Sequence, residues 1–362
     1  MDRKIVLEDG SIYEGFGFGS SRDRFAELVF NTSMVGYQEI ISDRSYTDQA
    51  VVMTYPVIGN YGIAADDFES EEPMISGLIV REYCKEPSNF RCMEELEEVM
   101  KRYDIAGVYG VDTRQITRHI RDIGSIKAYI TDINSDNDEA IAAVRNWIPE
   151  TDQVKRASCT KAYRYFENGG MNDKPVVVID CGIKLNILRE LEKRGISTVV
   201  VPWDTDAATI LAYDPCGIFI SNGPGNPEDC VATIKTIAEL KGKFPIFGIC
   251  LGHQIISLAY GAKTYKLKFG HRGGNHPVKN LITGKIEITS QNHSYAVVPE
   301  SLAGTGLKVT HMNLLDDTIE GVECESDRLF SVQYHPESAP GPCDSEYLFD
   351  RFAGLLRRQN NA

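Results

Sequence analysis

A cysteine flanked by glycines is the residue of this sequence best suited to chemistry. Cys250 is the centre of residues 248–252, Gly-Ile-Cys-Leu-Gly, between an apolar run and a stretch with helical spacing. This is the pattern of a nucleophile elbow with Cys in place of Ser, and it needs glycines because larger side chains would collide at so tight a turn. The thiol would project at a helix N-terminus, which favours negative charge on sulfur, and the N–H of Leu251 could hold an oxyanion. The alternative is a buried structural cysteine at a strand end.

A base and a group to orient it follow a second apolar run. His335 and Glu337 flank Pro336 directly after residues 329–333, which have the composition of a strand. A thiolate nucleophile needs a base, and the base needs an orienting group. Alone, His-Pro-Glu is also typical of an ordinary turn at a strand end. Its pairing with the Cys250 elbow favours a catalytic role.

Two further segments could serve the same site. Residues 222–225, Asn-Gly-Pro-Gly, form a stiff turn that could supply a second oxyanion donor or could be an ordinary strand-to-helix turn. Gln254 lies four residues after Cys250, on the same helix face, and can reach a substrate. His253 is expected to be structural. These groups suit acyl transfer through a thioester, and they do not choose between a peptidase and an amidase.

The elements that must position these motifs form an α/β pattern. Apolar runs at 176–179, 198–201, 217–221 and 245–249 predict strands, and the segments 186–194, 227–240 and 251–260 predict helices. Strands that alternate with helices imply a doubly wound, mostly parallel sheet with helices on both faces. Chemistry in such sheets gathers at the carboxyl ends of the strands, where the motifs fall.

The N-terminal half indicates a separate mixed α/β domain. Residues 4–7 predict a strand with a hairpin turn after it, residues 93–103 have helical spacing, and Ser135 is a candidate N-cap of a helix that Pro149 ends. The glycine-rich segment 15–19 misses the spacing of a dinucleotide-binding motif and predicts a hairpin or loop. We expect an N-terminal domain at 1–149, a polar linker at 150–173 and a second domain at 174–362.

Composition narrows the class of protein. A net charge of −14 over 362 residues argues against nucleic-acid binding. No apolar run approaches the ~20 residues that span a bilayer, and the first residues do not resemble a secretory signal. Nine cysteines without a CxxC pair favour reduced thiols, and the seven histidines do not cluster with them as metal ligands would. We therefore expect a soluble cytoplasmic protein without a metal site or a membrane partner.

The motifs together resemble a known family. Residues 247–254, 221–225 and 335–337 are similar to those of the triad-type, class I glutamine amidotransferases. The segments 31–40, 54–62, 110–114 and 269–278 resemble the small subunits of carbamoyl phosphate synthetases, and the likeness runs nearly end to end. An amidotransferase that serves anthranilate or GMP synthesis would lack these N-terminal segments.

The resemblance implies a glutaminase site. Cys250 would be the nucleophile, His335 the base and Glu337 its orienting group. The N–H groups of Gly223 and Leu251 would bind the oxyanion. Glutamine would be held by Ser45, Gly225, Gln254, Asn292, Ser294 and Tyr295. Ser45 comes from the N-terminal domain, so the pocket would lie between domains. The family has glycine and an aromatic residue, often Phe, at 294 and 295, so we expect backbone contacts there.

The resemblance also implies a partner. Ammonia would pass to a large synthetase subunit that uses bicarbonate and ATP, so ATP and a metal ion are expected on that subunit and no cofactor on this chain. The alternatives are the glutaminase subunit of another amidotransferase-synthase, and a non-catalytic regulatory subunit with the same fold. The sequence leaves open whether pyrimidine or arginine biosynthesis is served.

Overall fold

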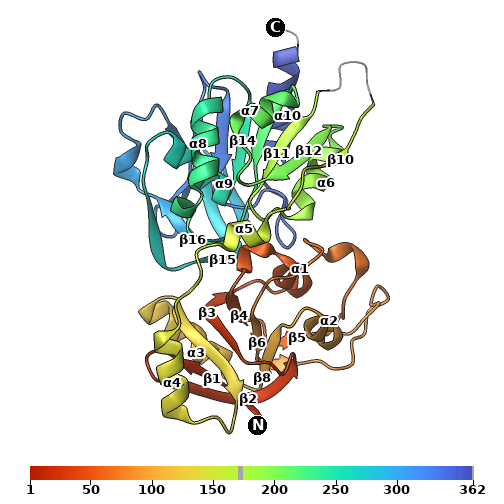
Figure 1. The fold of residues 1–362 in the computed structure, drawn as a ribbon, viewed down its shortest axis with the longest axis vertical. Coiled ribbons are helices and arrows are strands. Elements are labelled where there is room, and N and C mark those ends of the chain that lie inside the picture. Colours follow the sequence, from red (N-terminus) through yellow and green to blue (C-terminus); the bar gives the residue numbers. More distant parts are fainter. Residues whose placement is uncertain (170–173, 361–362) are drawn as a thin grey trace. The chain divides into compact units, whose positions relative to one another are not determined.

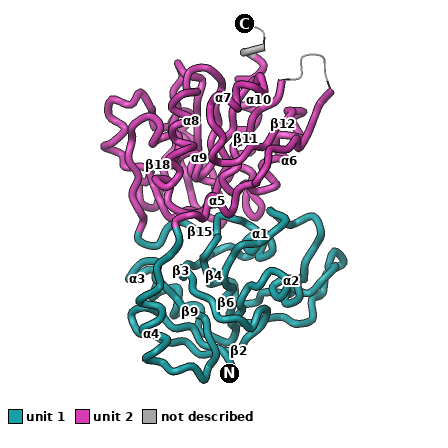
Figure 2. Tube along the Cα trace, viewed as in Figure 1, with its two compact units in different colours: residues 1–150, 268–272 teal, residues 151–267, 273–362 magenta. Residues whose placement is uncertain are grey.

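The computed structural model describes residues 1–169 and 174–360, and the chain divides into two compact units (Figure 1, Figure 2). Residues 1–150 and 268–272 form the first, which we call the barrel unit. Residues 151–267 and 273–362 form the second, which we call the sheet unit. Among the described residues, no helix combines the length and the apolar composition needed to cross a bilayer. A cytoplasmic location stays a prediction.

The barrel unit is a closed mixed barrel with the strand order β1-β2-β8-β6-β4-β3-β9. The run from β3 through β4 and β6 to β8 is parallel, and the other neighbours are antiparallel. The strands are β1 (Arg3–Leu7), β2 (Ile12–Gly19), β3 (Arg24–Asn31), β4 (Gln49–Met53), β6 (Gly77–Val80), β8 (Ala106–Tyr109) and β9 (Ile126–Asp132). Two short strands, β5 (Val57–Ile58) and β7 (Glu82–Tyr83), pair apart from the barrel.

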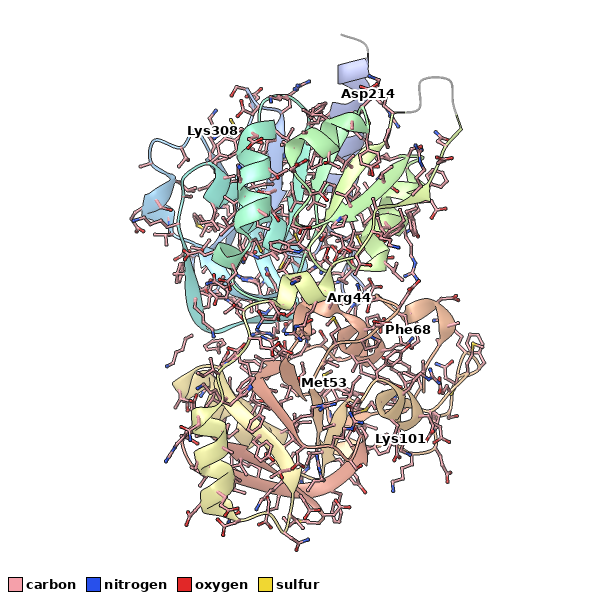
Figure 3. The ribbon with its side chains drawn as sticks, in the orientation of Figure 1. Arg44, Met53, Phe68, Lys101, Asp214 and Lys308 are labelled. Atoms are coloured by element: carbon pink, nitrogen blue, oxygen red, sulfur yellow. The ribbon has the colours of Figure 1, made fainter. Side chains whose placement is uncertain are left out.

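Helices pack on the barrel according to the two-residue period of its strands. Val29, Val51 and Leu78 pack with α1 and α2, whereas their neighbours Leu28 and Val52 pack with α3. The helices are α1 (Tyr37–Ser42), η1 (Arg44–Tyr46), η2 (Ala65–Asp67), α2 (Leu96–Arg102), α3 (Thr113–Ile123) and α4 (Asn137–Asn146). Figure 3 labels Met53, which is buried at the end of β4, and Lys101, which projects from α2 into solvent.

The sheet unit is built on a central parallel sheet. Its strand order is β10-β12-β11-β13-β14-β19-β18-β17-β15-β16, and β12, β11, β13, β14 and β19 are mutually parallel. The strands are β10 (Tyr163–Phe166), β11 (Val176–Asp180), β12 (Thr198–Pro202), β13 (Gly217–Ile220), β14 (Ile246–Ile249), β15 (Thr264–Asn280), β16 (Ile286–Val297), β17 (Lys308–Asn313), β18 (Ile319–Cys324) and β19 (Leu329–Val332). The α/β class and the predicted parallel strands are confirmed.

Helices cover both faces of this sheet. Ile237 of α8 and Ile256 of α9 pack on the face that carries Val177 and Ile218. The helices α6 and α10 pack on the opposite face, against aromatic residues such as Phe219. The helices are α5 (Gln153–Ala157), α6 (Leu185–Lys193), α7 (Ala207–Ala212), η3 (Pro227–Asp229), α8 (Val231–Leu240), α9 (Leu251–Ala259), η4 (Pro299–Leu302) and α10 (Tyr347–Asn360).

Local predictions about helix starts needed correction at two places. Asp136, not Ser135, caps α4: its carboxylate accepts from the Glu139 N–H at 3.0 Å, while the Ser135 hydroxyl donates to the Asp132 carbonyl at 2.8 Å. The helix predicted at 227–240 is two elements, η3 and α8. They are separated at Cys230, whose ψ of 41° does not continue a helix.

The glycine-rich segment 15–19, predicted to be a hairpin or loop, lies in the antiparallel hairpin of β1 and β2, whereas the expected linker is more ordered than predicted. The glycines at 15–19 lie within β2. Side chains do not fit there, because a Cβ on Gly15 would come within 2.5 Å of the Tyr109 carbonyl oxygen and one on Gly17 within 2.7 Å of Arg3 Cγ. The expected linker 150–173 contains α5 and the edge strand β10, which pairs with β12 and whose residues are exposed or half-buried. Most of the described linker residues are exposed or half-buried, which explains the polar composition of the linker. Residues 170–173 of that linker lie outside the described residues.

The aromatic core of the sheet unit provides a test of the packing. The Phe219 side chain is fully buried, and its ring centroid lies 5.2 Å from that of Phe247 and 6.1 Å from that of Phe352. Phe219→Ala should lower the free energy of unfolding by about 3–5 kcal/mol, because it removes a ring and leaves a cavity. Leu211→Ala, at a residue 42% exposed on α7, is the control and should change it by roughly 0.5 kcal/mol or less. Equal effects in urea titrations would contradict this packing.

Candidate active site

A strained turn at the end of β14 presents Cys250. Its φ of 54° and ψ of −104° lie outside the regions that L-residues usually adopt, and α9 begins at the next residue. A Cβ on Gly248 would lie 2.5 Å from Ile256 Cδ1, and one on Gly252 would lie 2.3 Å from the Ile220 carbonyl oxygen. Both glycines of the predicted elbow are therefore required by contacts with neighbouring elements.

Hydrogen bonds tie the elbow to the strands β19 and β16. The Cys250 N–H donates to the Val332 carbonyl of β19 at 2.9 Å, and its thiol lies 3.5 Å from the Asn292 carbonyl oxygen of β16. Only 2% of the Cys250 surface is exposed. The nucleophile candidate is thus held from both sides and lies in a nearly closed site.

His335 and Glu337 are brought to the same edge of the sheet, just beyond β19. Nδ1 of His335 lies 2.7 Å from Oε1 of Glu337, and both side chains are buried. The His335 N–H donates to the Ser290 carbonyl at 2.9 Å, which fixes the backbone that carries the ring. Among the described residues, Nε2 has no nitrogen or oxygen partner, and the group that interacts with this ring besides Glu337 is Cys250.

The charges in this array support one another. Burial alone would lower the pKa of His335, but the Glu337 carboxylate and the Cys250 side chain raise it to about 10. Burial alone would raise the pKa of Glu337, but Lys184 and His335 lower it to about 2. The ring can therefore accept a proton from the thiol and keep it beside a permanent carboxylate, as acyl transfer through a thioester requires.

Lys184 is a member of this array that the sequence analysis missed. Its ammonium group, almost fully buried, donates to Glu337 Oε1 at 3.0 Å and to the Ser338 carbonyl at 2.5 Å. It precedes α6, 153 residues before its carboxylate partner, so no local pattern reveals the pair. The available signal was a lysine four residues after the end of the buried strand β11, at the edge of the sheet where the other motifs gather.

The loop at 221–225 lies against the start of α9. A Cβ on Gly223 would lie 2.1 Å from the Cys181 carbonyl oxygen and 2.9 Å from Leu251 Cδ2, so only glycine fits there. The Asn222 side chain accepts from the Lys184 N–H at 3.1 Å and anchors the loop. Leu251 is the first residue of α9, and the helix itself does not use its N–H. Both predicted oxyanion donors thus lie close to the elbow.

The residues predicted to hold glutamine are distributed over several elements. Gln254 of α9 donates from Nε2 to the Tyr295 carbonyl of β16 at 2.8 Å and to Gln333 Oε1 at 2.9 Å. Asn292 is buried and Ser294 is half-buried in the same strand. Gly225 is exposed, with a φ of 84°. Ser45 lies in η1 of the barrel unit, and its part in the pocket stays a prediction.

A buried polar network behind β16 was also missed. His293 lies 2.8 Å from the Tyr295 carbonyl through Nδ1 and 2.9 Å from Gln291 Oε1 through Nε2. Gln291 in turn donates from Nε2 to Glu320 at 3.0 Å. The network fixes the Tyr295 carbonyl, which also accepts from Gln254. Residues 291, 293 and 295 alternate along one strand and so share a face, which the sequence could have indicated. The contact with Glu320 on β18 could not be predicted from the sequence.

The other histidine at the elbow has a different environment. His253 is fully buried in α9, and its Nδ1 lies 2.9 Å from the Ser331 hydroxyl. Burial, together with nearby His311, lowers its pKa to about 3, so it is neutral near pH 7. This matches the structural role expected for it.

Comparison with known proteins gives two family matches. Residues 177–355 match the family model described as glutamine amidotransferase class-I. Residues 5–130 match carbamoyl-phosphate synthase small chain, CPSase domain. Together the two matches account for most of both units.

Full-length relatives carry the corresponding name. A carbamoyl phosphate synthase small chain of Fusobacterium nucleatum is 49% identical over 351 residues, which are 97% of each chain. One of Staphylococcus saprophyticus is 51% identical and covers 98% of this chain and 96% of its own. A pyrimidine-specific small chain of Halalkalibacterium halodurans is 51% identical over 98% of this chain and 97% of its own.

Gly252 allows a test of the elbow, because helix propensity favours alanine at this position whereas the local contacts exclude it. Alanine is favoured over glycine within helices by about 1 kcal/mol, yet the Cβ of Gly252→Ala would lie 2.3 Å from a backbone oxygen. We expect this variant to lose both stability and glutamine hydrolysis. Gly354→Ala in α10 is the control: its Cβ meets nothing within 4 Å, so it should stabilise the protein and leave hydrolysis unchanged. An active, stable Gly252→Ala protein would contradict the elbow.

The pH dependence of stability tests the Glu337–His335 pair. The pKa of His335 rises from 6.5 unfolded to about 10 folded, so its stabilisation is complete below pH 6.5 and is lost as the pH rises through 10. The folded pKa of Glu337 is about 2, below its usual 4.5, so its own contribution is constant across that window. Glu337→Gln removes the charge that raises the His335 pKa. The gap in unfolding free energy between wild type and variant should narrow as the pH rises from 6.5 to 10, and a constant gap in urea titrations would refute the pairing.

Proposed function

The chain belongs to the carbamoyl phosphate synthase small-chain family, and we propose that its Cys250 elbow is the place where glutamine is hydrolysed. It is a glutamine-hydrolysing amidotransferase subunit with a class-I amidotransferase domain. The observation that carries the assignment of the site is the buried Cys250–His335–Glu337 array at the carboxyl edge of the sheet. A non-catalytic subunit would not need three buried polar side chains that interact with one another.

The first half of the proposed reaction forms a thioester. His335 holds the thiol proton while the Cys250 sulfur attacks the side-chain amide carbon of glutamine. Negative charge then develops on the amide oxygen, where the N–H groups of Gly223 and Leu251 stabilise it. The intermediate collapses as its C–N bond breaks, and His335 returns the proton to the leaving nitrogen. Ammonia departs and an acyl-enzyme remains on the cysteine.

The second half hydrolyses the thioester. His335, again neutral, takes a proton from water, whose oxygen attacks the same carbon. The same two N–H groups hold the second oxyanion. When the C–S bond breaks, the proton returns to sulfur and glutamate leaves. Glu337 orients the ring throughout, and Lys184 keeps that carboxylate ionised.

Glutamine recognition is proposed to combine backbone and side-chain groups. Gln254 is held by the Tyr295 carbonyl and by Gln333, so its amide is oriented before substrate arrives. Ser294 and Tyr295 would contribute backbone groups, because their side chains differ from the glycine and the aromatic residue, often Phe, that the family has at these positions. The remaining proposed contacts are Gly225, Asn292 and, from the barrel unit, Ser45.

The partner is proposed to be a large synthetase subunit. It would combine the ammonia with bicarbonate at the expense of ATP, and ATP and a metal ion would bind there instead of on this chain. The names of the relatives, each a small chain of carbamoyl phosphate synthase, support this proposal. No observation favours a different synthase.

Replacing the nucleophile tests the proposal. Cys250→Ala should lower glutamine hydrolysis by several orders of magnitude, because no thioester can form. The complex of this variant with the large subunit should still make carbamoyl phosphate from ammonium salt, since only the nitrogen source is lost. Cys84→Ala, at a thiol in the barrel unit, is the control and should retain both activities.

Three outcomes of this test differ in meaning. Full glutamine-dependent synthesis by Cys250→Ala would overturn the mechanism. Equal activities in variant and wild type with either nitrogen source would indicate a scaffold protein. Loss of both activities would indicate failed folding or assembly, and the hydrodynamic size of the complex would show which.

A further inference from the structure

The barrel unit carries an arginine-lined cavity that the glutaminase reaction does not use. The cavity has a volume of about 710 Å³, and Arg81, Arg114, Arg118 and Arg121 line it. We call these four residues the arginine surface. Asp112 is the one acidic residue among the lining side chains, so the lining is strongly positive on a chain whose net charge is −14.

Three of the arginines form one face of α3. Positions 114, 118 and 121 are spaced four and three residues apart, which places their side chains in a row along the helix. All four arginines of the surface are exposed. Like charges spaced in this way repel one another, so the row of arginines does not stabilise α3.

Most of this charge has no counter-ion among the residues that the structure describes. Arg114 and Arg118 have no ion pair or hydrogen bond to any described residue. Within the described part of the chain, the Arg81 side chain donates only to the Val111 carbonyl, at 3.3 Å, and the Arg121 side chain pairs only with its exposed neighbour Asp122, at 3.1 Å. The surface therefore offers several guanidinium groups whose donors are free to meet anionic groups from outside.

The shape of the surface favours a protein over a small molecule. The row on α3 spans roughly 10 Å along the helix axis, and a second hollow of about 380 Å³ shares Arg114 and Arg118 with the first. Those two arginines thus stand between two depressions. A small-molecule site would enclose most of its ligand, whereas these side chains are exposed. Nucleic acid would be repelled by the acidic remainder of the chain.

We propose that the arginine surface is a docking site for an acidic segment of the synthetase subunit that receives the ammonia. The proposal rests on the function proposed above. Arginine pairs with carboxylates through two parallel hydrogen bonds and is enriched at protein interfaces. The barrel unit would then serve assembly, whereas the sheet unit carries the nucleophile and its base.

Charge reversal on α3 tests the docking site. The double variant Arg114→Glu/Arg118→Glu should bind the purified synthetase subunit at least tenfold more weakly at low salt. Lys235→Glu, at an exposed lysine on α8, is the control for charge reversal on a helix surface and should bind as wild type does. Isolated wild-type and double-variant chains should hydrolyse glutamine equally and should have equal melting temperatures.

A second variant identifies the occupant. Arg118→Lys keeps the charge but supplies an amine that a zero-length carbodiimide can couple to a carboxylate. In the complex it should form a cross-link to Asp or Glu of the synthetase subunit, and mass spectrometry of the peptides would locate the acidic segment. Wild-type chain, with arginine at this position, should form no such link.

The outcomes distinguish this proposal from the function on which it rests. Wild-type affinity for the synthetase subunit in the double variant would overturn the docking site and leave the glutaminase assignment intact. So would binding of pyrophosphate or citrate that the double variant loses while its association with the synthetase stays normal, because the surface would then be a small-anion site. If the wild-type chain associates with no synthetase subunit, the proposed function itself fails.

Discussion

Cys250 can project its thiol from the sheet only while its backbone holds a conformation that L-residues avoid, with φ at 54°. Much of the sheet unit serves to hold it there. The carbonyl of Val332 fixes its N–H, and α9 begins at the next residue. The close contacts at Gly248 and Gly252 leave no room for relaxation. The strain is therefore balanced by packing from strands on both sides.

The same parallel order gathers the electrostatic partners of the thiol. Strands β11, β13, β14 and β19 are adjacent, so the chain segments after their carboxyl ends meet at one edge. Lys184, the 221–225 loop, Cys250 and His335 come from those four segments. Alternating charges make this burial tolerable, because each ionised group faces one of opposite sign. A buried site that contained only one of these charges would be costly.

Features whose residues lie close together in the sequence could be predicted, whereas features that depend on contacts between distant segments could not. The elbow was predictable because its motif lies within five consecutive residues, although the carbonyl that excludes a side chain at Gly252 belongs to Ile220 of another strand. The Lys184–Glu337 pair was not, because topology alone brings the two residues together. For the glycines of β2 the sequence left a hairpin and a loop both open, because the carbonyl of Tyr109 that excludes a side chain at Gly15 belongs to another strand.

Lys184 contacts two parts of the site that have different roles in the proposed mechanism, the 221–225 loop and Glu337. Its backbone N–H donates to the side chain of Asn222 in the 221–225 loop, and its ammonium group donates to Glu337. A shift of the loop therefore disturbs the carboxylate that orients the imidazole, and a shift of the carboxylate disturbs the loop. Substitutions at 222 and 337 should be thermodynamically non-additive, although the two side chains are not bonded to each other. Lys184 therefore couples the two positions, one through its backbone and the other through its side chain.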